Sequence, residues 1–121
     1  MNIVLICLTA FAALFHIAAF LLESVFFMKG AHKRFLVSEK DAPAVYPFAL
    51  NQGFYNLFLA MMLLAGLFIK LDGHILGVGM MAASSAVMMG AGIVLAVSNK
   101  KMIPAAILQG LPPAIIIFLL L

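Results

Sequence analysis

The amino-acid sequence predicts an all-α integral membrane protein in which four helices form a single bundle. Of the 121 residues, 67% are hydrophobic and only 9% are charged, and the mean hydropathy is +1.26. A soluble domain of this size buries only about two-thirds of the surface of its unfolded chain, so it could not hide so much apolar area. The lone cysteine, Cys7, excludes a disulfide-stapled secreted domain, and the high hydrophobicity excludes intrinsic disorder.

Four continuous apolar runs account for nearly the whole chain. We expect membrane spans at about residues 2–28, 48–69, 75–97 and 102–121, which makes residues 1–121 one four-helix transmembrane domain. Each run is close to the roughly 20 residues that a spanning helix needs, and none shows the alternation of a barrel strand. The first run is too long for a cleaved secretory signal, so we expect a retained signal anchor. Prolines and charges between residues 29 and 47, including Tyr46-Pro47, predict a loop.

The basic residues predict how the bundle is oriented. Six of the seven lie in the first and third loops, and only Lys70 lies in the second. The positive-inside rule then places those two loops in the cytoplasm and both termini outside, as in a multi-pass protein of the cytoplasmic (inner) membrane. We attribute the net charge of +3 to this topology and to contact with membrane lipids, not to a nucleic-acid partner. The six are Lys29, Lys33, Arg34, Lys40, Lys100 and Lys101.

Two ionisable residues interrupt the first span, where such side chains cost about 2.5–3.5 kcal/mol. Glu23 is either a boundary carboxylate that pairs with Lys29 or Lys33, or part of an intramembrane site. His16, seven residues earlier and on nearly the same helix face, is either a buried imidazole at a helix interface or part of the same site. This spacing is too long for the two side chains to bind one metal ion, so we expect no metal site.

Further polar residues occur at a similar predicted depth in two other spans. At about 100° per residue, Asn51, Gln52, Tyr55 and Asn56 fall within an arc of about 140° on the second helix. Gln109 lies in the same half of the fourth span, close to Pro112-Pro113. These prolines free helical carbonyls, which either help to line a cavity or only accompany a kink in the helix. We therefore predict one polar, ligand-binding layer near the cytoplasmic side. Its residues are Glu23, His16, Asn51, Gln52, Tyr55, Asn56 and Gln109.

Small residues recur every four positions in the third span, at Ala82, Ala86 and Gly90, and Gly73 and Gly77, also four apart, extend this stripe toward the outer end. Such a stripe lets another helix approach closely, either within the bundle or in a homo-oligomer. The methionines of this span are predicted to be adaptable packing residues. We therefore interpret the third helix as structural.

A known family shares this pattern of polar residues. The chain resembles the small bacterial integral membrane proteins grouped as domain of unknown function 1304, in His16 and Glu23, in YPFALNQGFYN at residues 46–56 and in QGLPP at residues 109–113. The resemblance covers essentially the whole chain and implies four membrane helices but no activity. Small multidrug-resistance transporters share the length, the four spans and a glutamate in the first helix, yet their general pattern includes a membrane-embedded tryptophan that this chain lacks. Transport is thus only an analogy.

Three functions fit the predicted polar layer. The first is a cytoplasm-facing site that binds or carries a small amphipathic or cationic molecule, with Glu23 as its counter-ion. The second is an intramembrane enzyme for a lipid-soluble substrate, with Glu23 and His16 as acid and base. The third is an accessory subunit whose polar face docks another membrane protein. No cofactor motif is evident, and no catalytic residue can be assigned.

Overall fold

The computed structural model describes residues 2–121, which form four long helices with short connections. Helix α1 (Ile3–Phe20) continues into the π-helical turn η1 (Leu21–Val25), and α2 (Ala42–Leu71), α3 (Ile75–Ser98) and α4 (Ile103–Leu120) follow. Each of the four is long and apolar enough to cross a membrane. The predicted all-α four-helix fold is confirmed, and its helices are those expected of a multi-pass membrane protein.

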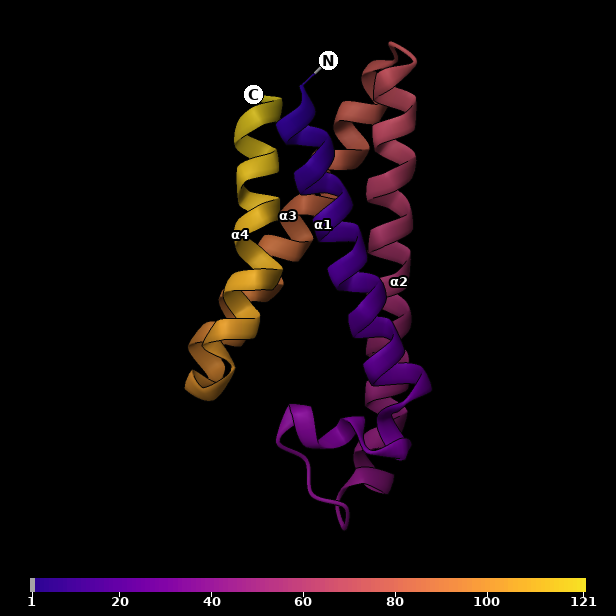
Figure 1. Ribbon diagram of the computed structural model, residues 1–121, viewed down its shortest axis with the longest axis vertical. Coiled ribbons are helices and arrows are strands. Elements are labelled where there is room, and N and C mark those ends of the chain that lie inside the picture. The colour runs from indigo at the N-terminus through magenta and orange to yellow at the C-terminus, as the bar shows by residue number, and fades with distance from the viewer. Residues whose placement is uncertain (1) are drawn as a thin grey trace.

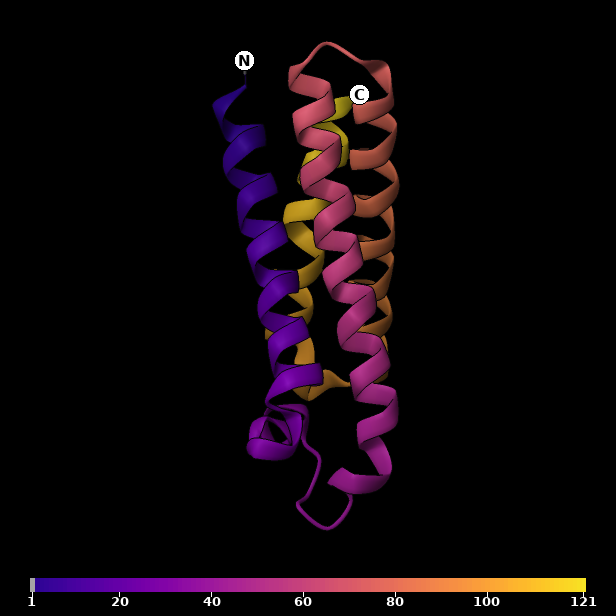
Figure 2. The same cartoon turned by 90° about the vertical axis from the view of Figure 1, so that its right-hand side faces the viewer.

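Successive helices run in opposite directions, so the two ends of the bundle differ in composition (Figures 1 and 2). Both ends of the chain and the α2–α3 connection lie at one end. The opposite end carries the 3₁₀ turns η2 (Phe27–Lys29), η3 (Ala31–Phe35) and η4 (Lys100–Met102). We call it the basic end, because it holds Lys29, Lys33, Arg34, Lys40, Lys100 and Lys101.

Helix α2 begins earlier than the sequence predicted. Tyr46 and Pro47, which we expected in a loop, are helical, because the helix already begins at Ala42. Pro43 lies in the first turn, where its missing N–H would have no intrahelical partner in any case. Pro47 removes one further backbone hydrogen bond without ending the helix. The loop prediction for this segment was therefore wrong.

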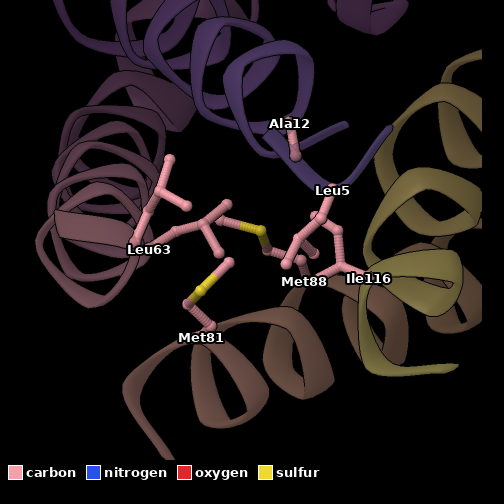
Figure 3. Close-up of a cluster of buried hydrophobic side chains, with 7 residues drawn as sticks. Leu5, Ala12, Leu63, Met81, Met88 and Ile116 are labelled. Carbon is pink, nitrogen blue, oxygen red and sulfur yellow. The ribbon is translucent and has the colours of Figure 1, made fainter. Parts of the chain in front are cut away.

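The centre of the bundle is packed with aliphatic and methionine side chains (Figure 3). Met81 and Met88 of α3 are fully buried there, which confirms their predicted packing role. Large apolar side chains also cover the outer surface, as with Phe48, which is 77% exposed, and Ile75, which is 82% exposed. In a membrane this surface contacts lipid instead of water. The core residues are Leu5, Ala12, Leu63, Leu67, Met81, Met88 and Ile116.

The backbones of neighbouring helices approach closely at Gly77, on the outer extension of the predicted stripe, and at Gly92, outside it. A Cβ atom on Gly77 would lie 2.5 Å from the carbonyl oxygen of Gly66, and one on Gly92 would lie 3.0 Å from the Cα atom of Gly110. In contrast, Ala86 is exposed, and a Cβ atom on Gly90 would meet nothing within 4 Å. The predicted stripe thus packs closely at Gly77 but not at Ala86 and Gly90, because a spacing of four residues does not say which positions meet a neighbour.

Candidate functional site

Glu23 lies on the π-helical turn η1 at the end of α1. This turn closes through a hydrogen bond of the i→i+5 type, which the Phe26 N–H donates to the Leu21 carbonyl at 2.8 Å. Turns of this kind are rare and often occur at functional sites. A π-helical turn holds more residues than an α-helical turn, so the α-helical spacing used to place Glu23 and His16 on one face does not hold through it. Glu23 alone of the two lines a cavity.

Contacts with α2 hold this turn in place. The Ser24 hydroxyl donates a hydrogen bond to the Leu50 carbonyl at 2.8 Å, and the Tyr46 hydroxyl donates one to the Ser24 carbonyl at 3.3 Å. Gly53 makes this approach possible, because a Cβ atom there would collide with the Ser24 hydroxyl. Three positions of α2 therefore fix the backbone on which Glu23 is mounted.

The Glu23 carboxyl group faces Asn56 of α2. The Asn56 amide nitrogen donates to both carboxyl oxygens, at 3.1 and 3.3 Å, and Asn56 itself is only 6% exposed. Lys29, the nearest basic residue in the sequence, instead places its ammonium 5.7 Å from the ring centroid of Phe26. The structure thus brings Glu23 to a polar partner inside the bundle and not to the loop lysine.

A cavity of about 770 Å³ opens beside this pair. In Figure 1 the α3–α4 pair diverges from the α1–α2 pair toward the basic end, with η3 extending beneath. Residues of all four helices and of η1, η3 and η4 line the cavity, and most of them are apolar. Its polar lining consists of Glu23, Arg34, Gln52, Asn56, Ser98, Lys101 and Gln109.

A second cavity, of about 440 Å³, lies between the segment after α1 and the start of α2. Asn51 lines this cavity and not the larger one. Glu23, Gln52 and Phe35 line both, so these three side chains lie at the boundary between the two cavities.

Two of the predicted site residues lie elsewhere. Tyr55 is 58% exposed on the outer surface of α2 and lines neither cavity. His16 is 1% exposed, lies outside both linings, and has its Nδ1 atom 2.8 Å from the Ala12 carbonyl oxygen. Its Nε2 atom is buried without a hydrogen-bond partner among residues 2–121. Of the predicted set, the structure brings Glu23, Gln52, Asn56 and Gln109 around one cavity.

Three polar residues of the cavity were not predicted from the sequence. Arg34 and Lys101 were interpreted as topology signals, and Ser98 as part of a loop boundary. One signal for these residues was available in the sequence. Each basic loop adjoins a span whose polar residues lie in the half nearest that loop. Within residues 2–121, no group of three His, Cys, Asp or Glu side chains is arranged to hold a metal ion.

Comparison with known proteins places the chain in a family. The model of the DUF1304 family of proteins of unknown function matches residues 10–121. The chain belongs to this family. The DUF1304 match covers most of α1 and all of α2, α3 and α4, and so includes every polar residue of the larger cavity. No curated protein and no solved structure matches the chain.

Proposed function

We propose that this DUF1304 protein binds or carries a small amphipathic molecule in the larger cavity. We further propose that it resides in a bacterial inner membrane with both termini outside, so that the cavity opens on the cytoplasmic side. The distribution of basic residues supports this orientation, since six of seven lie at the basic end.

The Glu23–Asn56 pair on the cavity wall carries the proposal. A carboxylate can accept about four hydrogen bonds, and the Asn56 amide nitrogen supplies only one donor group. Glu23 therefore has unused hydrogen-bond acceptor sites toward the cavity. Within a membrane span, a carboxylate with few hydrogen-bond partners is costly. A hydroxyl or amine of a bound molecule would use that capacity.

The rest of the lining favours an amphipathic ligand over a simple cation. Most lining residues are apolar, which suits a hydrocarbon portion of the ligand. Arg34 and Lys101 line the same cavity as Glu23 and would repel a ligand that carries only positive charge. The volume of about 770 Å³ falls within the range of sites that hold one drug-sized molecule.

Neither alternative function gains support from a particular contact. The enzyme hypothesis needs His16 near Glu23, and His16 lines neither cavity. The accessory-subunit hypothesis would use the exposed side chain of Tyr55, but Asn56 is buried in the bundle and its amide is already bonded to Glu23. Each of these two hypotheses would nevertheless give its own distinct result in the binding experiment.

Titration with 1-monooleoylglycerol, followed by native mass spectrometry of the detergent-purified chain, tests the proposal. This probe has two hydroxyl donors and one apolar chain. Glu23→Gln keeps the shape of the side chain but removes its charge, and a hydrogen bond to a charged group contributes about 1.5–3 kcal/mol. The glutamine oxygen still accepts a neutral hydrogen bond of about 0.5–1.5 kcal/mol, so we expect Glu23→Gln to bind about 5–10-fold more weakly than the wild type, since about 1.4 kcal/mol corresponds to tenfold.

Glu39→Gln is the matched control, because Glu39 is exposed in the loop and lines neither cavity. This variant should bind like the wild type. Equal binding by wild type and Glu23→Gln, with both helical by circular dichroism, would refute the proposal. Conversion of the probe to a new mass would support the enzyme hypothesis instead, and stoichiometric copurification of one membrane protein the accessory-subunit hypothesis.

A further inference from the structure

Two basic side chains from different loops meet at the larger cavity. Arg34 is carried by η3, which follows α1, and Lys101 by η4, which connects α3 to α4. The other four basic residues of the basic end do not line the cavity. Figure 1 shows the η3 segment extending beneath the divergent helix pairs, on the side where η4 lies. The mouth of the cavity is thus positively charged on two of its walls.

The lining changes character in a fixed order from this mouth inward. Arg34 and Lys101 lie in the turns at the basic end, and Glu23 and Asn56 follow within the helices. Beyond them, the wall of α1 is formed by Ala19, Ala18 and Phe15. Eight residues separate Phe15 from Glu23, which corresponds to about 12 Å of helix. Along α1 and the turns of the basic end, basic residues, a hydrogen-bond acceptor and an apolar wall therefore succeed one another, while Gln109 adds a polar group on α4.

We propose that the ligand is a single-chain anionic amphiphile of the lysophospholipid type. In such a molecule a phosphate, a glycerol hydroxyl and a hydrocarbon chain follow one another in the same order as the complementary groups of the cavity. The phosphate would lie between Arg34 and Lys101, the hydroxyl would donate to Glu23, and the chain would pack along the apolar wall. The planar guanidinium of arginine suits a phosphate because it donates two parallel hydrogen bonds.

Basic residues between helices on the cytoplasmic side of membrane proteins are known to bind anionic lipid headgroups. The inference rests on the proposed function, because it assumes that the cavity binds an amphiphile at all. It goes beyond that function by specifying that the ligand has a negatively charged headgroup and a single hydrocarbon chain. A single chain is favoured because the cavity of about 770 Å³ matches one drug-sized molecule.

The test compares four probes on the full-length protein by native mass spectrometry and competition. They are 1-oleoyl-lysophosphatidic acid, 1-monooleoylglycerol, glycerol-3-phosphate and inorganic phosphate. The first two differ only in the phosphate, and the third lacks the chain. We expect the lysophosphatidic acid to bind at least tenfold more tightly than 1-monooleoylglycerol, and the two soluble phosphates at least tenfold more weakly than the lipid.

The double variant Arg34→Gln, Lys101→Gln should lose that tenfold advantage, measured as the ratio of its own affinities for the two lipids. Its matched control is Lys33→Gln, Lys100→Gln, which removes the same charge from the same two connections but from side chains outside the cavity lining. This control should keep the advantage. All four side chains are exposed, so both variants should fold, as circular dichroism would verify.

Equal losses in the two double variants would overturn the inference, because they would indicate general attraction between a basic surface and an anion. An affinity for glycerol-3-phosphate as high as for the lysolipid would also overturn it, in favour of a soluble phosphate ligand. If 1-monooleoylglycerol binds in a Glu23-dependent way but the phosphate adds nothing, this inference fails and the proposed function stands. If neither lipid binds, both fail.

Discussion

Gly53→Ala provides a direct test of how the Glu23 turn is held in place. A Cβ atom at position 53 would collide with the Ser24 hydroxyl, and it would lie 3.0 Å from the Ser24 Cβ atom and 3.1 Å from the Ser24 backbone nitrogen. The hydroxyl could rotate away only by giving up its 2.8 Å hydrogen bond to the Leu50 carbonyl. The backbone nitrogen has no such freedom, so η1 must move away from α2.

The expected cost follows from three contributions. Overpacking a close contact costs about 1–3 kcal/mol, and an interhelical hydrogen bond in a membrane is worth about 0.6 kcal/mol. Replacing glycine by alanine in a helix returns about 0.8–1.0 kcal/mol. We therefore expect Gly53→Ala to lower the free energy of unfolding by about 1–2 kcal/mol. Because Glu23 lies on the displaced turn, the affinity for 1-monooleoylglycerol should fall as well.

Unfolding by SDS in mixed detergent micelles, followed by circular dichroism, measures the change. Gly90→Ala is the control, since a Cβ atom there would meet nothing within 4 Å, and it should be neutral or slightly stabilising. The double variant Ser24→Ala, Gly53→Ala removes the colliding hydroxyl and should recover part of the loss. If Gly53→Ala were as stable as Gly90→Ala and bound the probe normally, the proposed packing of η1 against α2 would be refuted.

Three further predictions concern other parts of the chain. Gly77→Ala should cost about 2 kcal/mol, the upper part of the overpacking range less the gain from replacing a helical glycine, because its Cβ atom would meet the backbone of α2 and no movable side chain; a loss no larger than that of Gly53→Ala would contradict this. His32→Ala removes the 2.7 Å contact between the His32 Nδ1 atom and the Val37 carbonyl oxygen, so amide exchange should accelerate in η3 and remain unchanged in α3; uniform acceleration would indicate global destabilisation. With Cys7 replaced by serine, Ser38→Cys should react with a membrane-impermeant maleimide only after cells are permeabilised, and labelling of intact cells would reverse the proposed orientation.

The four helices could be predicted from composition because the membrane makes hydrophobicity and length nearly sufficient. The ends of the helices were harder to predict. Pro43 and Pro47 indicated a loop, yet a helix tolerates proline in its first turn and can lose one further hydrogen bond near its end. Close-packing faces could be predicted only in part, since Gly77 on the outer extension of the stripe meets α2 closely but Gly90 meets nothing within 4 Å.

The grouping of polar residues in one half of the bundle could be predicted, whereas their partners and their direction around the helix could not. Counting residues from the predicted span edges placed Asn56 near the level of His16, but the structure joins Asn56 to Glu23 by hydrogen bonds. The same count grouped Tyr55 with them, although Tyr55 is exposed on the outer surface. An arc of about 140° on a helix is wide enough to reach both the interior and the lipid. His16 differs again, because it is buried and lines neither cavity.

The basic residues illustrate why a signal with one good explanation can hide a second role. Arg34 and Lys101 count toward membrane orientation in the same way as Lys33 and Lys100, and nothing in the sequence distinguishes the two pairs. Only the fold separates them, because η3 and η4 bring Arg34 and Lys101 from connections about 70 residues apart to one cavity. Orientation depends on the number of charges at one end, whereas ligand binding depends on which charges meet. Replacing Arg34 and Lys101 in one variant, and Lys33 and Lys100 in another, therefore separates the two roles. Each double variant removes two positive charges from the basic end, but only the first alters the cavity lining.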